Sequence, residues 1–143
     1  MAGNALISII RLSRPINLLI VSATMLGVYV YVNALNPKIA IDSMYLSLLV
    51  ISTVLITAGG NIINDYYDLK ADEINKPSKV IISKNISKEL SLRIYILLNL
   101  LALSLGFYLS FIFETFWFAG IHTLCTLLLW LYSIYLKKIL LLG

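Results

Sequence analysis

The spacing of the charged residues is the feature that most constrains how this chain folds. Four stretches carry no charge: residues 15–37, 43–64, 94–113 and 115–136, which hold 23, 22, 20 and 22 residues. A helix of about 20 mostly apolar residues crosses a bilayer. The sequence therefore predicts an all-α, polytopic membrane helix bundle. We place its four transmembrane helices at about 15–35, 43–64, 94–113 and 115–136, in one domain covering residues 1–143.

Composition supports the same class of protein. The chain is 60% hydrophobic and 13% charged, and its mean hydropathy is +0.93. Soluble domains carry about 25% charged residues. We therefore expect the lipid bilayer to be the main environment of the chain.

The basic residues are distributed unevenly between the two sides of the predicted bundle. Ten of the eleven lie before the first stretch, between the second and third, or after the fourth, and Lys38 is the exception. The positive-inside rule then places both termini and the 65–93 loop in the cytoplasm. This orientation accounts for the net charge of +4, so we expect no nucleic-acid partner. The prediction is a multi-pass integral membrane protein, in the cytoplasmic membrane if the source is prokaryotic.

A single histidine, His122, lies inside the fourth predicted span. Polar residues inside a membrane are often functional. A single histidine of this kind is more typical of a hydrogen bond between helices. We predict that structural role for His122.

Acidic residues are concentrated just after the second charge-free stretch. Four of the seven fall within nine residues: Asp65, Asp68, Asp72 and Glu73. If the helix continues through Asp72, five polar residues share an arc of about 100°. We call this set the acidic face: Asn61, Asn64, Asp65, Asp68 and Asp72.

Like charges three or four residues apart on a helix repel one another, so the acidic face predicts a compensating cation. Its carboxylate and amide oxygens suit Mg²⁺. The alternative is a solvated helix end whose Asp and Asn residues serve as caps.

Lysines follow the acidic face directly, among them Lys76 and Lys79. Basic side chains beside a metal can bind the outer phosphate of a metal-bound diphosphate. An acidic face and a basic loop at the mouth of an apolar bundle favour a substrate with a diphosphate head and a long hydrocarbon tail.

Several motifs in this chain resemble those of the UbiA superfamily of intramembrane prenyltransferases. Asn64–Asp65–Tyr–Tyr–Asp68–Leu–Lys–Ala–Asp72 matches the NDxxDxxxD motif, and residues 72–77, DEINKP, resemble the DxINKP run. Residues 11–17, RLSRPIN, resemble an RxxRPxN start of the first helix. Residues 131–138 resemble an LYSxxLK end of the fourth. These motifs occur in the family's order across nearly the whole chain.

The resemblance implies the first half of a roughly nine-helix prenyltransferase bundle. It implies an enzyme that binds a polyprenyl diphosphate through Mg²⁺ and transfers the prenyl group to a lipid or aromatic acceptor. In this chain, the implied metal ligands are Asn64, Asp65, Asp68 and Asp72. The implied catalytic residues are Asp68 and Asp72. The implied substrate-binding residues are Arg14, Asn17, Asn61, Lys76, Lys79, Tyr132 and Lys137.

The family also has a second Asp-rich motif, but this sequence has no Asp or Glu after Glu114. We therefore expect the N-terminal half of such an enzyme, with a missing C-terminal half as its partner. The motifs favour a branch that transfers geranylgeranyl to geranylgeranylglycerol phosphate, with quinone, haem or chlorophyll-type acceptors as alternatives. An inactive fragment, or a small four-helix membrane protein that binds metal or a partner, is the alternative function.

Overall fold

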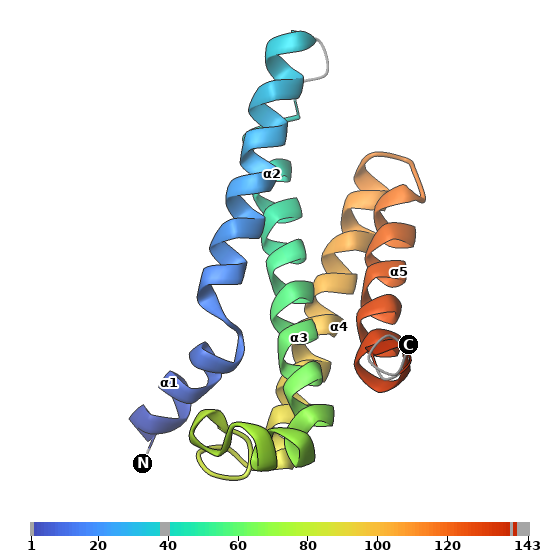
Figure 1. Ribbon diagram of the computed structural model, residues 1–143. Coiled ribbons are helices and arrows are strands. Elements are labelled where there is room, and N and C mark those ends of the chain that lie inside the picture. Colours follow the sequence, from blue (N-terminus) through green and yellow to red (C-terminus); the bar gives the residue numbers. More distant parts are fainter. Residues whose placement is uncertain (1, 38–40, 138, 140–143) are drawn as a thin grey trace.

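The computed structural model describes residues 2–37, 41–137 and 139, and the bundle that they form is all-α (Figure 1). Four helices are long and apolar enough to cross a membrane. They are α2 (Pro15–Leu35), α3 (Ser43–Asn75), α4 (Lys88–Ile112) and α5 (Trp117–Leu131), the last extended by a π-helical turn over Tyr132–Leu136. The predicted polytopic bundle with four long apolar helices is confirmed.

A short helix, α1 (Ala2–Leu12), precedes the first long helix and had not been predicted as a separate element. Arg14 separates α1 from α2 and has a left-handed backbone, with φ of 55°. Pro15 then occupies the first position of α2, where its fixed φ and missing N–H are tolerated. The chain therefore turns sharply at Arg14, and α1 lies at an angle to α2 (Figure 1).

Helix α3 continues unbroken past the last of the aspartates, as the acidic face requires. It begins at an Asp42 cap, whose carboxylate accepts a hydrogen bond from the Met44 N–H. Its 33 residues span about 50 Å at 1.5 Å per residue, whereas a hydrocarbon core is about 30 Å thick. One end of α3 therefore extends beyond the hydrocarbon region, and the sequence places the charged residues at the end that leads to Asn75.

The centre of the bundle is held by a hydrogen bond from α5 to α3. His122 Nε2 lies 2.7 Å from Ser52 Oγ, and His122 Nδ1 lies 2.7 Å from the carbonyl oxygen of Phe118. All of these groups are protein partners, so the predicted helix–helix role of His122 is confirmed. Gly106 of α4 faces the imidazole, because a Cβ built there would lie 2.7 Å from His122 Cγ.

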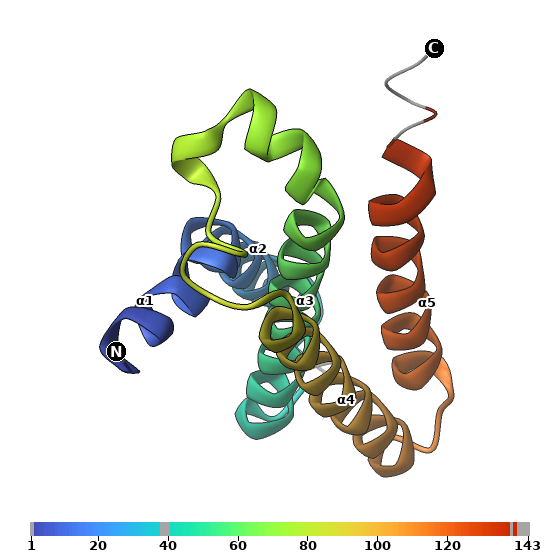
Figure 2. The same cartoon turned by 90° about the horizontal axis from the view of Figure 1, so that it is seen from below.

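The connection between α3 and α4 packs against the bundle. After a short 3₁₀ turn at Pro77–Lys79, Ile82 and Ile86 are buried in a cluster with Leu12 and Ile62. Figure 2 shows this connection, in yellow-green, passing between α1 and the start of α4. Ser87 then caps α4 by accepting a hydrogen bond from the Leu90 N–H. Residues 79–82 of this connection thus lie beside Asp65 and Asp72 of α3.

Candidate functional site

Three predicted site residues form one hydrogen-bonded cluster at the charged end of the bundle. The ammonium of Lys137 lies 2.5 Å from Asp68 Oδ1 and 3.2 Å from Asn64 Oδ1. The Asn64 amide nitrogen donates to Asp68 Oδ2 at 3.0 Å. Lys137 is buried, with 10% of its side chain exposed, and Asp68 is 29% exposed. We call these three residues the Lys137 cluster.

A second pair joins the α1–α2 junction to the same helix face. Arg14 forms an ion pair with Asp65 at 2.5 Å, and the Asn61 amide donates to the carbonyl oxygen of Ser13 at 2.8 Å. These two contacts from α3 hold the left-handed turn at Arg14. The guanidinium of this pair is half-exposed, at 45%, whereas the carboxylate is 23% exposed.

The compensating cations that the acidic face requires are therefore present in the chain itself. Arg14 neutralises Asp65, and Lys137 neutralises Asp68. Over the residues that the structure describes, no group of three or more His, Cys, Asp or Glu side chains is placed to hold a metal ion. The proposed ligand set of Asn64, Asp65, Asp68 and Asp72 remains a prediction.

A cavity of about 270 Å³ opens beside the Lys137 cluster. It lies between α3, the start of α2 and the end of α5. Four of its lining residues belong to the predicted site, and the other four were not predicted from the sequence. The predicted residues are Arg14, Asn61, Asn64 and Tyr132, and the additional ones are Thr57, Gly60, Leu129 and Ser133. The angle per residue of a helix placed Asn61 on this face. Ser133 belongs to the motif at residues 131–138 but was not assigned to the site, and no sequence signal marked Leu129.

The remaining predicted residues divide into two groups. Asp72 and Lys79 line a narrow space of about 20 Å³ together with Asp65, under the connection that carries Val80 and Ile82. Asn17 on α2 and Lys76 at the end of α3 are exposed. Their side chains lie outside the cluster and outside both of these cavities.

The π-helical turn precedes Lys137 directly and affects the direction in which it points. The Lys137 N–H bonds to the carbonyl oxygen of Tyr132, five residues earlier, instead of the four of a regular α-helix. Each residue of an α-helix turns by about 100°. An uninterrupted α-helix would therefore present Lys137 about 100° away from its observed direction. Lys138, which belongs to the same sequence motif, lies outside the described residues.

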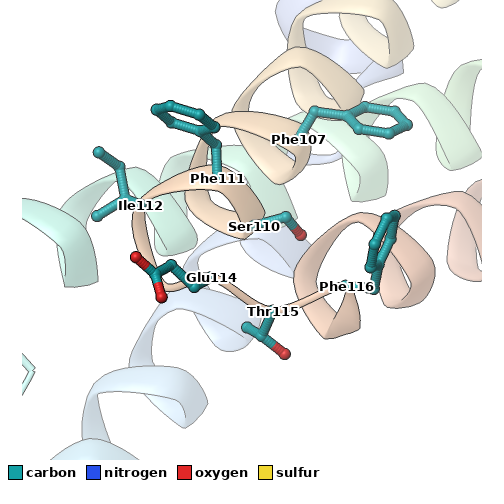
Figure 3. Close-up of a pocket in the computed structure, with 7 residues that line it drawn as sticks. All are labelled: Phe107, Ser110, Phe111, Ile112, Glu114, Thr115 and Phe116. Atoms are coloured by element: carbon teal, nitrogen blue, oxygen red, sulfur yellow. The ribbon is translucent and has the colours of Figure 1, made fainter.

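Another cavity lies at the opposite end of the bundle. It has a volume of about 630 Å³, and residues of the α4–α5 turn line it. Figure 3 shows three phenylalanine rings around the turn, with the Glu114 carboxylate at its edge. Because α4 begins near the acidic end of α3 and runs antiparallel to it, this hollow is remote from the Lys137 cluster.

A family model described as the UbiA prenyltransferase family matches residues 20–143, which include the Lys137 cluster. The chain belongs to the UbiA prenyltransferase family. The resemblance inferred from the sequence motifs is thereby confirmed.

Curated UbiA-type relatives are similar to this chain over most or all of its length. A digeranylgeranylglyceryl phosphate synthase of Methanospirillum hungatei is 35% identical over 143 residues, which is 100% of this chain and 46% of the relative. One of Korarchaeum cryptofilum is 38% identical over 107 residues, which is 72% of this chain and 34% of the relative. The chain thus spans between a third and a half of the length of these relatives.

A solved structure from work on digeranylgeranylglyceryl phosphate synthase in membranes is also similar to this UbiA-family chain. The TM-score is 0.79 at 27% sequence identity, and the match covers 94% of this chain and 45% of the other. The similarity covers all four long helices, so the chain has the fold of a membrane prenyltransferase over its length. Together with these helices, family membership makes it a multi-pass integral membrane protein.

The donor atoms of the Lys137 cluster fit a hard divalent cation. Asn64 Oδ1 and both carboxylate oxygens of Asp68 lie on one helix face, and two of these three oxygens already bind a cationic group. Oxygen ligands of this kind are those that Mg²⁺ prefers. The cluster is therefore chemically suited to one side of a metal–diphosphate complex.

Proposed function

We propose that this chain is part of a membrane prenyltransferase that transfers a geranylgeranyl group from its diphosphate to a lipid-like acceptor with Mg²⁺. The observation that carries the proposal is the Lys137 cluster beside the 270 Å³ cavity. It places oxygen ligands and a buried cation at the charged end of an otherwise apolar bundle. A diphosphate head requires both, and an apolar bundle accommodates the hydrocarbon tail.

On this proposal, the residues of the acidic face and Lys137 have different roles. Asn64 and Asp68 hold the metal, and Asp65 and Asp72 act as further ligands or orient those two. Bound Mg²⁺ would neutralise the charge that builds on the departing diphosphate. Lys137 binds a phosphate oxygen directly, because a buried ammonium needs an anionic partner.

The basic and polar residues around the acidic face bind the rest of the substrates. Lys76 and Lys79 extend from the α3–α4 connection and contact the outer phosphate. Arg14 and Asn17 lie at the start of α2 and face the acceptor. Asn61 and Tyr132 line the cavity, where the tyrosine ring stabilises positive charge on the reacting carbon. The apolar helices exclude water, which would otherwise capture that carbon.

The acceptor that we propose is a geranylgeranylglyceryl phosphate. Its support is the name of the curated relatives, which are digeranylgeranylglyceryl phosphate synthases. We also propose that both termini and the α3–α4 connection face the cytoplasm, on the basis of the basic residues. Turnover would require a second Asp-rich motif from a further part of such an enzyme.

Binding of geranylgeranyl diphosphate tests the proposal directly. The chain is placed in lipid nanodiscs and titrated with this ligand in the presence of Mg²⁺ and again in EDTA. We expect saturable binding with Mg²⁺ and binding weaker by about ten-fold or more in EDTA. Geranylgeraniol, which lacks the diphosphate, is the control and should not saturate. Equal binding of the alcohol and the diphosphate would contradict the proposal.

One observation favours a second function. Arg14 and Lys137 already neutralise the two aspartates that they contact, as they would in a helix bundle without catalytic activity. The chain would then be a small membrane protein that binds a metal or a partner. This alternative predicts that any metal binding is unaffected by geranylgeranyl diphosphate, which the same titration measures.

A further inference from the structure

The Lys137 ammonium occupies the oxygens to which the proposed function assigns the metal. It contacts Asn64 Oδ1 at 3.2 Å and Asp68 Oδ1 at 2.5 Å. The second carboxylate oxygen accepts the Asn64 amide at 3.0 Å. The lysine can only donate hydrogen bonds, which fixes the orientation of the Asn64 amide. The cluster is therefore internally satisfied, with one negative and one positive charge.

A bare divalent cation cannot bind these oxygens while the ammonium remains there. Metal–oxygen distances for Mg²⁺ are about 2.1 Å, so the metal and the ammonium would lie within a few ångström of each other. In a half-buried site, where water screens charges poorly, the two cations repel each other strongly. The ammonium must therefore leave before the metal binds.

Displacing Lys137 is costly unless another anion replaces Asp68. Its side chain is 10% exposed, and a buried cation without a partner loses hydration that nothing restores. A diphosphate that arrives with the metal brings phosphate oxygens within reach of the ammonium, because both bind the same cluster. Those oxygens can replace the carboxylate as the partner of Lys137.

The cation of the other ion pair on the acidic face, Arg14 with Asp65, can be displaced without this cost. Arg14 is 45% exposed, so its guanidinium can turn into water when a cation approaches Asp65. An exposed pair of this kind contributes little free energy. Of these two cations, Lys137 therefore restricts metal binding and Arg14 does not.

We propose that Lys137 makes metal binding at Asn64 and Asp68 conditional on diphosphate, so that metal and diphosphate bind together and neither binds tightly first. The inference rests on the proposed function and adds an order of events to it. It makes the buried lysine a competitor of the free metal and a ligand of the metal–diphosphate complex.

The test measures Mn²⁺, as a spectroscopic substitute for Mg²⁺, bound to the full chain in nanodiscs after separation from free ions. Wild type is compared with Lys137→Met, with and without geranylgeranyl diphosphate. In wild type, we expect diphosphate to increase the affinity for Mn²⁺ by about ten-fold or more, a usual size for coupling between two ligands. In Lys137→Met, we expect Mn²⁺ to bind without diphosphate about ten-fold more tightly than in wild type, and the coupling to shrink.

Two further variants separate this effect from a loss of charge or of folding. Lys70→Met removes an exposed positive charge two residues from Asp68 on α3, on a different side of the helix, and should retain the wild-type coupling. Lys137→Gln keeps a hydrogen-bonding side chain beside Asn64 and should behave like Lys137→Met. The helical circular dichroism of each variant confirms that it is folded.

The outcomes separate the inference from the proposed function. If wild type and both Lys137 variants bind Mn²⁺ equally without diphosphate, and bind it more tightly with diphosphate, the inference is wrong and the proposed site stands. If none of the folded proteins binds Mn²⁺ under either condition, the proposed function itself fails, and the inference fails with it.

Discussion

His122 Nε2 and Ser52 Oγ lie 2.7 Å apart and join α5 to α3 in the buried part of the bundle. His122 Nδ1 also lies 2.7 Å from the carbonyl oxygen of Phe118, and the Ser52 hydroxyl donates to the carbonyl oxygen of Leu49 at 2.8 Å. The two residues are 70 positions apart in the sequence, so this contact fixes the position of α5 relative to the helix that carries the aspartates.

Replacing Ser52 by Ala should lower the free energy of unfolding by about 1 kcal/mol, because the histidine loses its partner between helices. Ser104→Ala is the matched control. Its hydroxyl is exposed and bonds to Leu100 of its own helix at 2.8 Å. Thermal unfolding in detergent measures both changes. Equal effects of the two substitutions would show that the inter-helix bond contributes nothing measurable.

Gly106→Ala should destabilise the bundle by about 1–3 kcal/mol, the usual range for overpacking a close contact. The new methyl would lie 2.7 Å from His122 Cγ and 3.0 Å from its Cβ, so the ring or the helix must move. Gly27→Ala and Gly120→Ala are controls. Among the described residues, no atom beyond the adjoining residues and the helix's own backbone lies within 4 Å of a Cβ at either position. These two should be neutral or slightly stabilising in the same unfolding experiment. A neutral Gly106→Ala would contradict the tight packing of α4 against His122.

Arg14→Gly and Arg14→Ala both remove the ion pair with Asp65 but differ in backbone freedom. The left-handed φ of 55° suits glycine and costs other residues about 1 kcal/mol or more. We expect the glycine variant to be more stable than the alanine variant by about 1 kcal/mol. Chemical unfolding of the two proteins, measured side by side, gives this difference. An alanine variant of equal or greater stability would mean that the turn is not held in this conformation.

Asp68→Asn and Asn64→Ala should each weaken Mg²⁺-dependent binding of geranylgeranyl diphosphate by about ten-fold or more, because each removes a proposed metal ligand. Glu89→Gln is the matched control, since this acid is exposed in the first turn of α4, away from the Lys137 cluster. It should bind as wild type does. Equilibrium binding in nanodiscs measures all three. Unchanged binding in both site variants would remove the aspartate face from the proposed site.

The four long helices and their order were predictable because charge and hydropathy determine which segments enter a membrane. The acidic face was predictable for a related reason. A helix has a fixed angle per residue, so Asn61 and Asp72 were expected on one side, and the unbroken helix α3 places them there.

The partners of those aspartates were not predictable from the spacing. Lys137 is 69 residues from Asp68 in the sequence and Arg14 is 51 residues from Asp65, and only the packing of three helices brings them together. Basic residues near a membrane follow the positive-inside rule in any case, so their presence in the sequence did not indicate an ion pair. The sequence therefore could not show that two of the aspartates have basic partners, and a metal ion was expected as the compensating cation.

The π-helical turn at Tyr132–Leu136 also bears on how this helix has changed in evolution. A π turn absorbs one additional residue, so the residues after it keep the directions that they would have in a shorter, regular helix. The insertion of a single codon can add such a residue and still leave the rest of the helix in register. Relatives whose corresponding helix is regular should therefore lack one residue just before their lysine. A correct alignment with such relatives needs a gap inside a membrane helix, where gaps are normally penalised.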